Sequence, residues 1–165
     1  MFQKAIIIGC PGAGKSTFAR VLRDKTDLPL YYLDMIWHKP DRTTVDRKIF
    51  DEKLREIISR DKWIIDGNYG RTLEMRIQSC ETIFLLDFPV AECLAGVESR
   101  IGKQRVDMPW TETEFDEKFR QWIIDFPQNE LPVIYKLLDR YKSEKSIYIF
   151  HARAEVNDYI IKTFS

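Results

Sequence analysis

Apolar residues occur along the chain in two alternating patterns. One is the short continuous run typical of a buried strand, and five such runs are Lys4–Ile8, Leu30–Leu33, Trp63–Ile65, Ile83–Leu86 and Ser146–Phe150. The other is helical spacing, which predicts helices from Lys15, over Asp46–Arg60, over Ala91–Ile101 and from about Ala154. Parallel strands need crossover connections that are usually helical, so the alternation predicts an α/β fold whose parallel sheet is covered by helices on both faces.

The stretch from Gly102 to Asp125 departs from this alternation. A basic segment, Lys103–Arg105, comes first, and Thr111 with Glu114 then forms a candidate capping box for a helix that carries aromatic residues. No internal repeat, low-complexity tract or linker suggests a second domain. We therefore expect one domain over residues 1–165.

Composition places the chain among ordinary globular enzymes. Its 165 residues are 44% hydrophobic and 32% charged, enough for a core without disulfides or a structural metal. Basic and acidic residues number 26 each, so no net field draws the protein to nucleic acid or to a membrane. The three cysteines form no CxxC pair, and the N-terminal apolar run is too short for a signal peptide or a membrane span. We expect a cytoplasmic protein.

A phosphate-binding motif lies between the first predicted strand and the first predicted helix. It reads Gly9-Cys10-Pro11-Gly12-Ala13-Gly14-Lys15-Ser16, a complete G-x-x-x-x-G-K-[ST] sequence. The glycines let backbone N–H groups curl around a phosphate, and the helix N-terminus adds its dipole. We expect Lys15 to bridge the β- and γ-phosphates, and Ser16, with Thr17 beside it, to offer a hydroxyl to Mg²⁺.

Three acidic residues follow predicted strands and point to a second part of the site. Asp66 or Asp87 could act on the magnesium water shell from the carboxyl edge of the sheet, where ligands of open α/β folds bind. Asp34 could orient an acceptor hydroxyl or a magnesium water. Each could also be a turn or cap residue, and spacing alone does not choose between Asp66 and Asp87.

Phosphoryl transfer also needs cations on the migrating oxygens. Arg71 follows the loop after Asp66, while Arg100 and Arg105 flank the basic segment. Their positions after predicted strand ends make all three candidate catalytic residues, although any one of them could be a solvated surface arginine.

These motifs resemble nucleoside monophosphate kinases of the adenylate kinase type. Ala5–Ser16 is similar to the opening strand and P-loop of those enzymes, and Trp63–Arg71 to their strand and D-G-F-P-R loop. The resemblance implies a P-loop NTPase fold of three layers with a five-stranded parallel core and a short lid at about residues 101–111. It favours Asp66 over Asp87 as a magnesium ligand, and it gives Arg71 the role of holding the acceptor's phosphate.

Nearly the whole chain also resembles the bacterial topology modulation protein family (FlaR-like), itself related to the adenylate kinases. The similar segments are Leu28–Pro40, Asp66–Tyr69, and Arg100–Lys103 followed by Pro109-Trp110. The family name associates these proteins with DNA supercoiling. By resemblance to the kinases, Arg153, in the turn after the last strand, is expected to adjoin the adenine.

The sequence therefore predicts an ATP- and Mg²⁺-dependent phosphotransferase, with Arg100 and Arg105 closing over the migrating phosphate. The alternative is an ATP-binding regulatory or DNA-associated module whose basic surface would be Lys103, Arg105 and Trp110. A GTPase is disfavoured because no N-K-x-D sequence occurs, and a protein kinase is excluded because no H-R-D loop occurs. The acceptor and the oligomeric state stay open.

Overall fold

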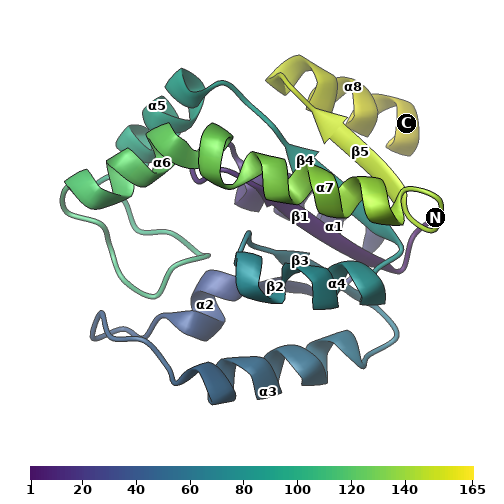
Figure 1. Cartoon of the computed structure of the whole chain (residues 1–165), viewed down its shortest axis with the longest axis horizontal. Coiled ribbons are helices and arrows are strands. Elements are labelled where there is room, and N and C mark those ends of the chain that lie inside the picture. The colour runs from purple at the N-terminus through teal and green to yellow at the C-terminus, as the bar shows by residue number, and fades with distance from the viewer.

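Five strands form one fully parallel sheet in the computed structural model, which describes residues 1–165 (Figure 1). The strands are β1 (Lys4–Gly9), β2 (Leu30–Tyr32), β3 (Trp63–Asp66), β4 (Thr82–Leu86) and β5 (Ser146–Phe150). Their spatial order is β2-β3-β1-β4-β5, and every neighbouring pair is parallel. The predicted five-stranded parallel sheet is confirmed.

The three central strands are buried on both faces. All four residues from Ala5 to Ile8 and all four from Ile83 to Leu86 have no exposed surface. A strand covered on both sides needs apolar side chains pointing both ways, which explains why the sequence shows continuous runs rather than alternation. The edge strand β5 instead alternates between exposed and half-buried positions.

Helices cover both faces of the sheet. They are α1 (Lys15–Thr26), α2 (Leu33–Trp37), α3 (Arg47–Ile58), α4 (Leu73–Ser79), α5 (Val90–Arg100), α6 (Glu117–Asn129), α7 (Leu131–Tyr141) and α8 (Arg153–Phe164). On one face, the ring of Phe18 in α1 lies 5.2 Å from Phe84 in β4 and 6.3 Å from Tyr159 in α8. On the other, Tyr141 in α7 donates a 2.9 Å hydrogen bond to Glu74 in α4. In Figure 1, α4 and α7 lie toward the viewer and α1 lies behind the sheet.

Several predicted ends are shifted by one or two residues, and two of the differences have a local cause. The strand expected to end at Leu33 ends at Tyr32, because Leu33 already begins α2. The capping box of Thr111 and Glu114 does not form, because α6 begins at Glu117 and its cap is Asp116, which accepts a 2.9 Å hydrogen bond from the amide of Phe119. An aspartate caps a helix at least as well as a threonine, which agrees with a helix that begins after Asp116 and not after Thr111.

None of the eight helices combines the length and the apolar character needed to cross a membrane.

A buried arginine fixes the loop that follows β3. Arg76 in α4 has no exposed surface, and its guanidinium donates to the backbone carbonyls of Gly67 at 2.8 Å, Asn68 at 2.9 Å and Tyr69 at 2.9 Å. Burial lowers the pKa of Arg76 to about 10, so the side chain is still charged at neutral pH. Asp66 ends β3 just before this loop. Arg76 therefore fixes the backbone that positions the Asp66 carboxylate.

We predict that Arg76→Met lowers the free energy of unfolding by about 2–4 kcal/mol, because it takes a charged donor from three carbonyl groups of this loop and leaves that of the buried Asn68 without it. The matched control is Arg140→Met, which removes an exposed ion pair with Glu74 and should cost less than about 1 kcal/mol. Urea denaturation of the two variants measures both values. Equal losses would show that Arg76 does not hold the loop.

Candidate active site

The parallel sheet brings the P-loop and two of the predicted carboxylates to one edge. Ile7 of β1 and Tyr32 of β2 both lie in register with Asp66 at the end of β3. The P-loop leaves β1 at this edge, and Asp34 lies in the first turn of α2, directly after β2. They line one open cleft with a volume of about 1190 Å³, large enough for a nucleotide and a second ligand together.

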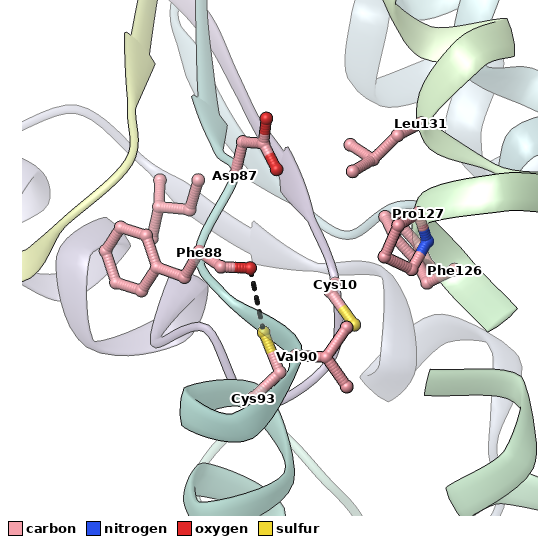
Figure 2. A pocket seen from close by; sticks show the side chains of 9 residues that line it. Cys10, Asp87, Phe88, Val90, Cys93, Phe126, Pro127 and Leu131 are labelled. Atoms are coloured by element: carbon pink, nitrogen blue, oxygen red, sulfur yellow. Dashed lines mark hydrogen bonds between the residues drawn. The ribbon is translucent and has the colours of Figure 1, made fainter. Parts of the chain in front are cut away.

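The P-loop is pressed against α5. A Cβ atom on Gly12 would clash with the carbonyl oxygen of Cys93, and one on Gly96 would clash with the carbonyl oxygen of Gly12. Behind this contact is a small, mostly apolar cavity, shown in Figure 2, with Cys10 of the P-loop and Cys93 of α5 on its wall. The thiol of Cys93 donates a 3.7 Å hydrogen bond to the carbonyl of Phe88. The loop is therefore supported from behind by backbone rather than by flexible side chains.

Two basic side chains contact the P-loop itself. The Lys15 ammonium group donates a 3.1 Å hydrogen bond to the carbonyl of Cys10, so it lies folded over the loop. Arg153, the first residue of α8, donates a 2.8 Å hydrogen bond to the carbonyl of Ala13, and its guanidinium lies 5.0 Å from the ring centroid of Phe88. Both side chains line the cleft, as do Pro11, Gly12, Gly14, Ser16 and Thr17, whereas Gly9, the last residue of β1, and Ala13 are buried and do not line it.

Ser16 is the centre of a cluster of oxygen atoms. Its hydroxyl lies 2.6 Å from Oδ2 of Asp66 and 2.9 Å from Oδ2 of Asp107, although one hydroxyl proton can be donated to only one of them. Burial, with smaller contributions from the charges of Asp34 and Asp107, raises the pKa of Asp66 to about 6. Oδ1 of Asp66 is buried and has no hydrogen-bond partner. An orphaned carboxylate oxygen among oxygen-only donors is an arrangement that fits Mg²⁺.

Asp107 is the residue of this cluster that the sequence analysis missed. It lies in the lid segment, residues 101–116, which connects α5 to α6 and extends toward α2 in Figure 1. Its side chain is only 6% exposed. The signal that could have found it is simple: Asp107 is the sole acidic residue in the lid expected at about 101–111.

Arg100, which ends α5, and Arg105, in the lid segment, both lie against carboxylates. Arg105 pairs with Asp107 and, at 2.6 Å, with Oε1 of Glu112, while Nε of Arg100 lies 3.1 Å from the same oxygen of Glu112. Burial, followed by the charge of Arg105, lowers the pKa of Arg100. Arg105 and Asp107 connect the lid segment to Ser16, so the lid lies against the P-loop.

The basic surface expected for a DNA-associated module is not formed. The Arg105 side chain is 15% exposed and lies between two carboxylates. Trp110 is half-buried and covered by Arg42, whose guanidinium carbon lies 5.1 Å from its ring centroid. Of the three expected residues only Lys103 is exposed.

The remaining candidates separate into those inside and outside the cleft. Asp34 lines the cleft and accepts a 2.6 Å hydrogen bond from the hydroxyl of Tyr69, whose pKa is raised mainly by burial. Asp87 accepts a hydrogen bond from Tyr135 and does not line the cleft.

Arg71 also lies outside the cleft. It is 45% exposed and forms a bidentate ion pair with Asp51 of α3, at 2.7 and 3.1 Å. The structure therefore brings Asp34 and Asp66 together and leaves Arg71 apart.

Comparison with known proteins shows relatives among kinases. A shikimate kinase of Rhodococcus jostii (strain RHA1) is 32% identical over 108 residues, which are 57% of this chain and 64% of that protein. An adenylate kinase of Thermotoga neapolitana is 27% identical over 89 residues, 53% of this chain and 40% of that protein. The chain thus spans less than two thirds of the length of these curated relatives. No protein-family model matches it.

Solved structures show the same fold over nearly the whole chain. Shikimate kinase from Bacteroides thetaiotaomicron superposes with a TM-score of 0.61 at 14% identity, covering 98% of this chain and 96% of that one. Deoxyadenosine kinase from M. mycoides, with the products dCMP and dCDP, gives 0.55 at 12% identity, covering 96% and 95%. The chain therefore has the P-loop fold of nucleotide and small-molecule kinases. It is homologous to shikimate and adenylate kinases, and the finer resemblance to the topology modulation proteins stays a prediction.

We predict that Gly96→Ala lowers the free energy of unfolding by about 1–3 kcal/mol, the reverse of the gain that alanine usually brings to a helix. The cause is the clash of the new Cβ atom with the backbone of Gly12, which cannot rotate away. The control is Glu98→Ala at an exposed position of the same helix, expected to change stability by less than about 0.5 kcal/mol. Thermal or urea unfolding measures both, and a stabilised Gly96→Ala protein would contradict the close approach.

The raised pKa of Asp66 predicts how stability depends on pH. Between its ordinary value of 3.8 and its folded value of about 6, the folded protein keeps a proton that the unfolded chain has lost. The free energy of unfolding contributed by this group therefore falls by about 2 kcal/mol as pH rises from about 4 to about 7. Asp66→Asn cannot bind or release this proton. The difference in the free energy of unfolding between wild type and variant, measured by urea denaturation in metal-free buffer, therefore isolates the contribution of Asp66. A difference that does not vary with pH would refute the shift.

Proposed function

We propose that this chain is a Mg²⁺-dependent phosphotransferase that moves the γ-phosphoryl group of ATP to a hydroxyl group of a small-molecule or nucleotide acceptor. The observation that carries the proposal is the oxygen cluster of Ser16, Asp66 and Asp107, which lies at the end of the P-loop and within the same cleft as the arginines at the end of α5 and in the lid. Homology to shikimate and adenylate kinases supports the reaction class.

Each side of the donor site has a distinct role in this proposal. The P-loop amides and the N-terminus of α1 would bind the phosphates, with Lys15 on the β- and γ-phosphoryl oxygens. Ser16, Asp66 and Asp107 would hold Mg²⁺, which when bound neutralises charge on the same oxygens. Arg153 would lie beside the nucleotide because it lines the cleft and donates a hydrogen bond to the carbonyl of Ala13 in the P-loop.

The lid would close the other side of the migrating phosphoryl group. Arg100 and Arg105 are positioned by Glu112 and Asp107, so their guanidinium groups are oriented before any ligand arrives. Fixed cations of this kind stabilise the charge that develops on the transferred oxygens. Asp34, held by Tyr69, would orient the acceptor hydroxyl and take its proton. Because the reaction consumes ATP, we propose the cytoplasm as its location.

We predict that Lys15→Met lowers kcat for ADP release by at least about 100-fold, because it removes a cation from the migrating phosphoryl group. Asp107→Asn should raise the Mg²⁺ concentration needed for half-maximal rate by about tenfold, because a neutral amide replaces one charged ligand. The matched control is Lys103→Met, an exposed lysine of the lid, which should leave both values unchanged.

A coupled assay of ADP release across nucleosides, nucleoside monophosphates and hydroxylated metabolites measures these effects, with ATP binding followed separately by titration calorimetry. ATP binding without stimulation by any acceptor would favour the regulatory alternative over a kinase. An Asp107→Asn protein with unaltered Mg²⁺ dependence would remove Asp107 from the metal site.

A further inference from the structure

The part of the cleft beyond Ser16 has walls of its own, which we name the acceptor half. It is formed by α2, the segment after α2, the loop after β3 and the lid, and six of its residues are Asp34, Trp37, His38, Arg42, Tyr69 and Trp110. Direct contacts join them: Tyr69 bonds to Asp34, the rings of His38 and Trp110 lie 5.9 Å apart, and Arg42 covers Trp110.

Resting on the proposed kinase function, we propose that the acceptor is a hydroxyl-bearing ring compound that carries no phosphate group. Three independent properties of the acceptor half support this: the shape of its walls, the hydrogen-bonding character of its polar groups and its charge.

The walls are aromatic and come from two sides. Trp37 lines the cleft from α2 and is fixed against Phe50 of α3 with ring centroids 5.6 Å apart at 88°. Trp110 lines it from the lid and is fixed by His38 edge-to-face at 88° and by Arg42 at 5.1 Å. Rigid aromatic walls bind the flat or apolar face of a ring with little loss of side-chain entropy.

The carboxylate at the base of the acceptor half selects for a donor. Tyr69 donates to Oδ1 of Asp34 at 2.6 Å and is itself stacked on Phe50 at 5.3 Å, so the carboxylate is held in one orientation. A carboxylate only accepts hydrogen bonds at neutral pH, which suits a hydroxyl and repels a phosphate.

The charge balance also disfavours a phosphate monoester. Such a group brings about 1.5 to 2 negative charges and is usually bound by a guanidinium free to form two hydrogen bonds. Arg105 is paired with Asp107 and Glu112, and Arg100 approaches Glu112 through Nε. The proposed donor chemistry assigns both arginines to the migrating phosphoryl group, so neither is left for a second phosphate. Glu114, Asp116 and Glu130 also line the cleft. Arg42 donates to the carbonyl of Thr111 at 3.2 Å, and its guanidinium carbon lies 5.1 Å from the ring centroid of Trp110, so it supports the aromatic wall.

Arg71, the residue that the resemblance to adenylate kinases assigns to the acceptor's phosphate, is absent from this half. Its guanidinium group lies on the outer surface and donates to both carboxylate oxygens of Asp51.

The proposed step conserves atoms and charge. The acceptor oxygen forms a bond to the γ-phosphorus of ATP, and the bond from that phosphorus to the β,γ-bridging oxygen breaks. Its electron pair leaves with ADP. The hydroxyl proton passes to Asp34 and then to water, so the products are a phosphate monoester of the acceptor, ADP and one proton.

The test uses the full chain with pairs of acceptors in which one hydroxyl is either free or carries a phosphate: the nucleosides with their 5′-monophosphates and with their 3′-monophosphates, which keep the 5′-hydroxyl, and shikimate with shikimate 3-phosphate. We expect at least one unphosphorylated member to raise ADP release by about tenfold over the basal rate, and its phosphorylated partner to reach less than about a tenth of that stimulation. Mass spectrometry of the product confirms transfer. A preference for the phosphorylated members would overturn this inference and leave the kinase proposal intact, whereas no stimulation by any compound while ATP still binds would overturn both.

Two arginine variants give a second readout with the best acceptor. Arg42→Met should raise its KM by about tenfold with the KM for ATP unchanged, because the support of Trp110 is lost. Arg71→Met should leave both KM values within about twofold of wild type, since its partner Asp51 is outside the cleft. Both residues are substantially exposed, so both variants should fold. A KM for the acceptor that rises in Arg71→Met and not in Arg42→Met would place a phosphate grip at Arg71 and overturn the inference.

Discussion

The uniform direction of the five strands is the constraint on which the rest of the molecule depends. Because every neighbouring pair is parallel, the carboxyl ends of all strands meet at one edge, and the residues that follow each strand are neighbours in space although they are distant in sequence. The P-loop, Asp34 and Asp66 are close for this reason alone. An antiparallel sheet with the same apolar runs would place them at opposite edges.

This gathering has an electrostatic cost. Asp66 and Asp107 share one serine hydroxyl, and Asp34 adds a third carboxylate whose charge raises the pKa of Asp66 further. Like charges held this close repel one another, and the charge of Lys15 at Asp66 and the ion pair of Arg105 with Asp107 act against this repulsion. The buried clamp of Arg76 on the loop after β3 holds the backbone in place against that repulsion, from a position that does not line the cleft. The carboxylates therefore lower the stability of this edge of the sheet, and a divalent cation bound among them would remove their repulsion.

Features set by local sequence could be predicted, and features set by register or by irregular segments could not. The P-loop is a continuous motif, so its place between β1 and α1 follows from the sequence directly. The placement of Asp66 rather than Asp87 beside Ser16 depends on where α1 starts relative to β3 and β4, which no spacing reveals. Asp107 lies in a segment without periodicity, and α4 is too short for its seven residues to show a helical pattern. The start of α6 was misplaced because two capping residues compete within six positions.

Arg71 illustrates why a motif can match while the role of one residue does not carry over. Arg71 follows the loop after β3, where the motif of the adenylate kinases has its arginine. Its side chain, however, is bound by Asp51, a residue of α3 some twenty positions earlier. A guanidinium satisfied by both oxygens of a carboxylate gains little by turning into a cleft that is already lined with acidic groups. The acceptor half is therefore formed by α2, the segment after it, the loop after β3 and the lid, while the P-loop edge carries the residues proposed to bind the donor.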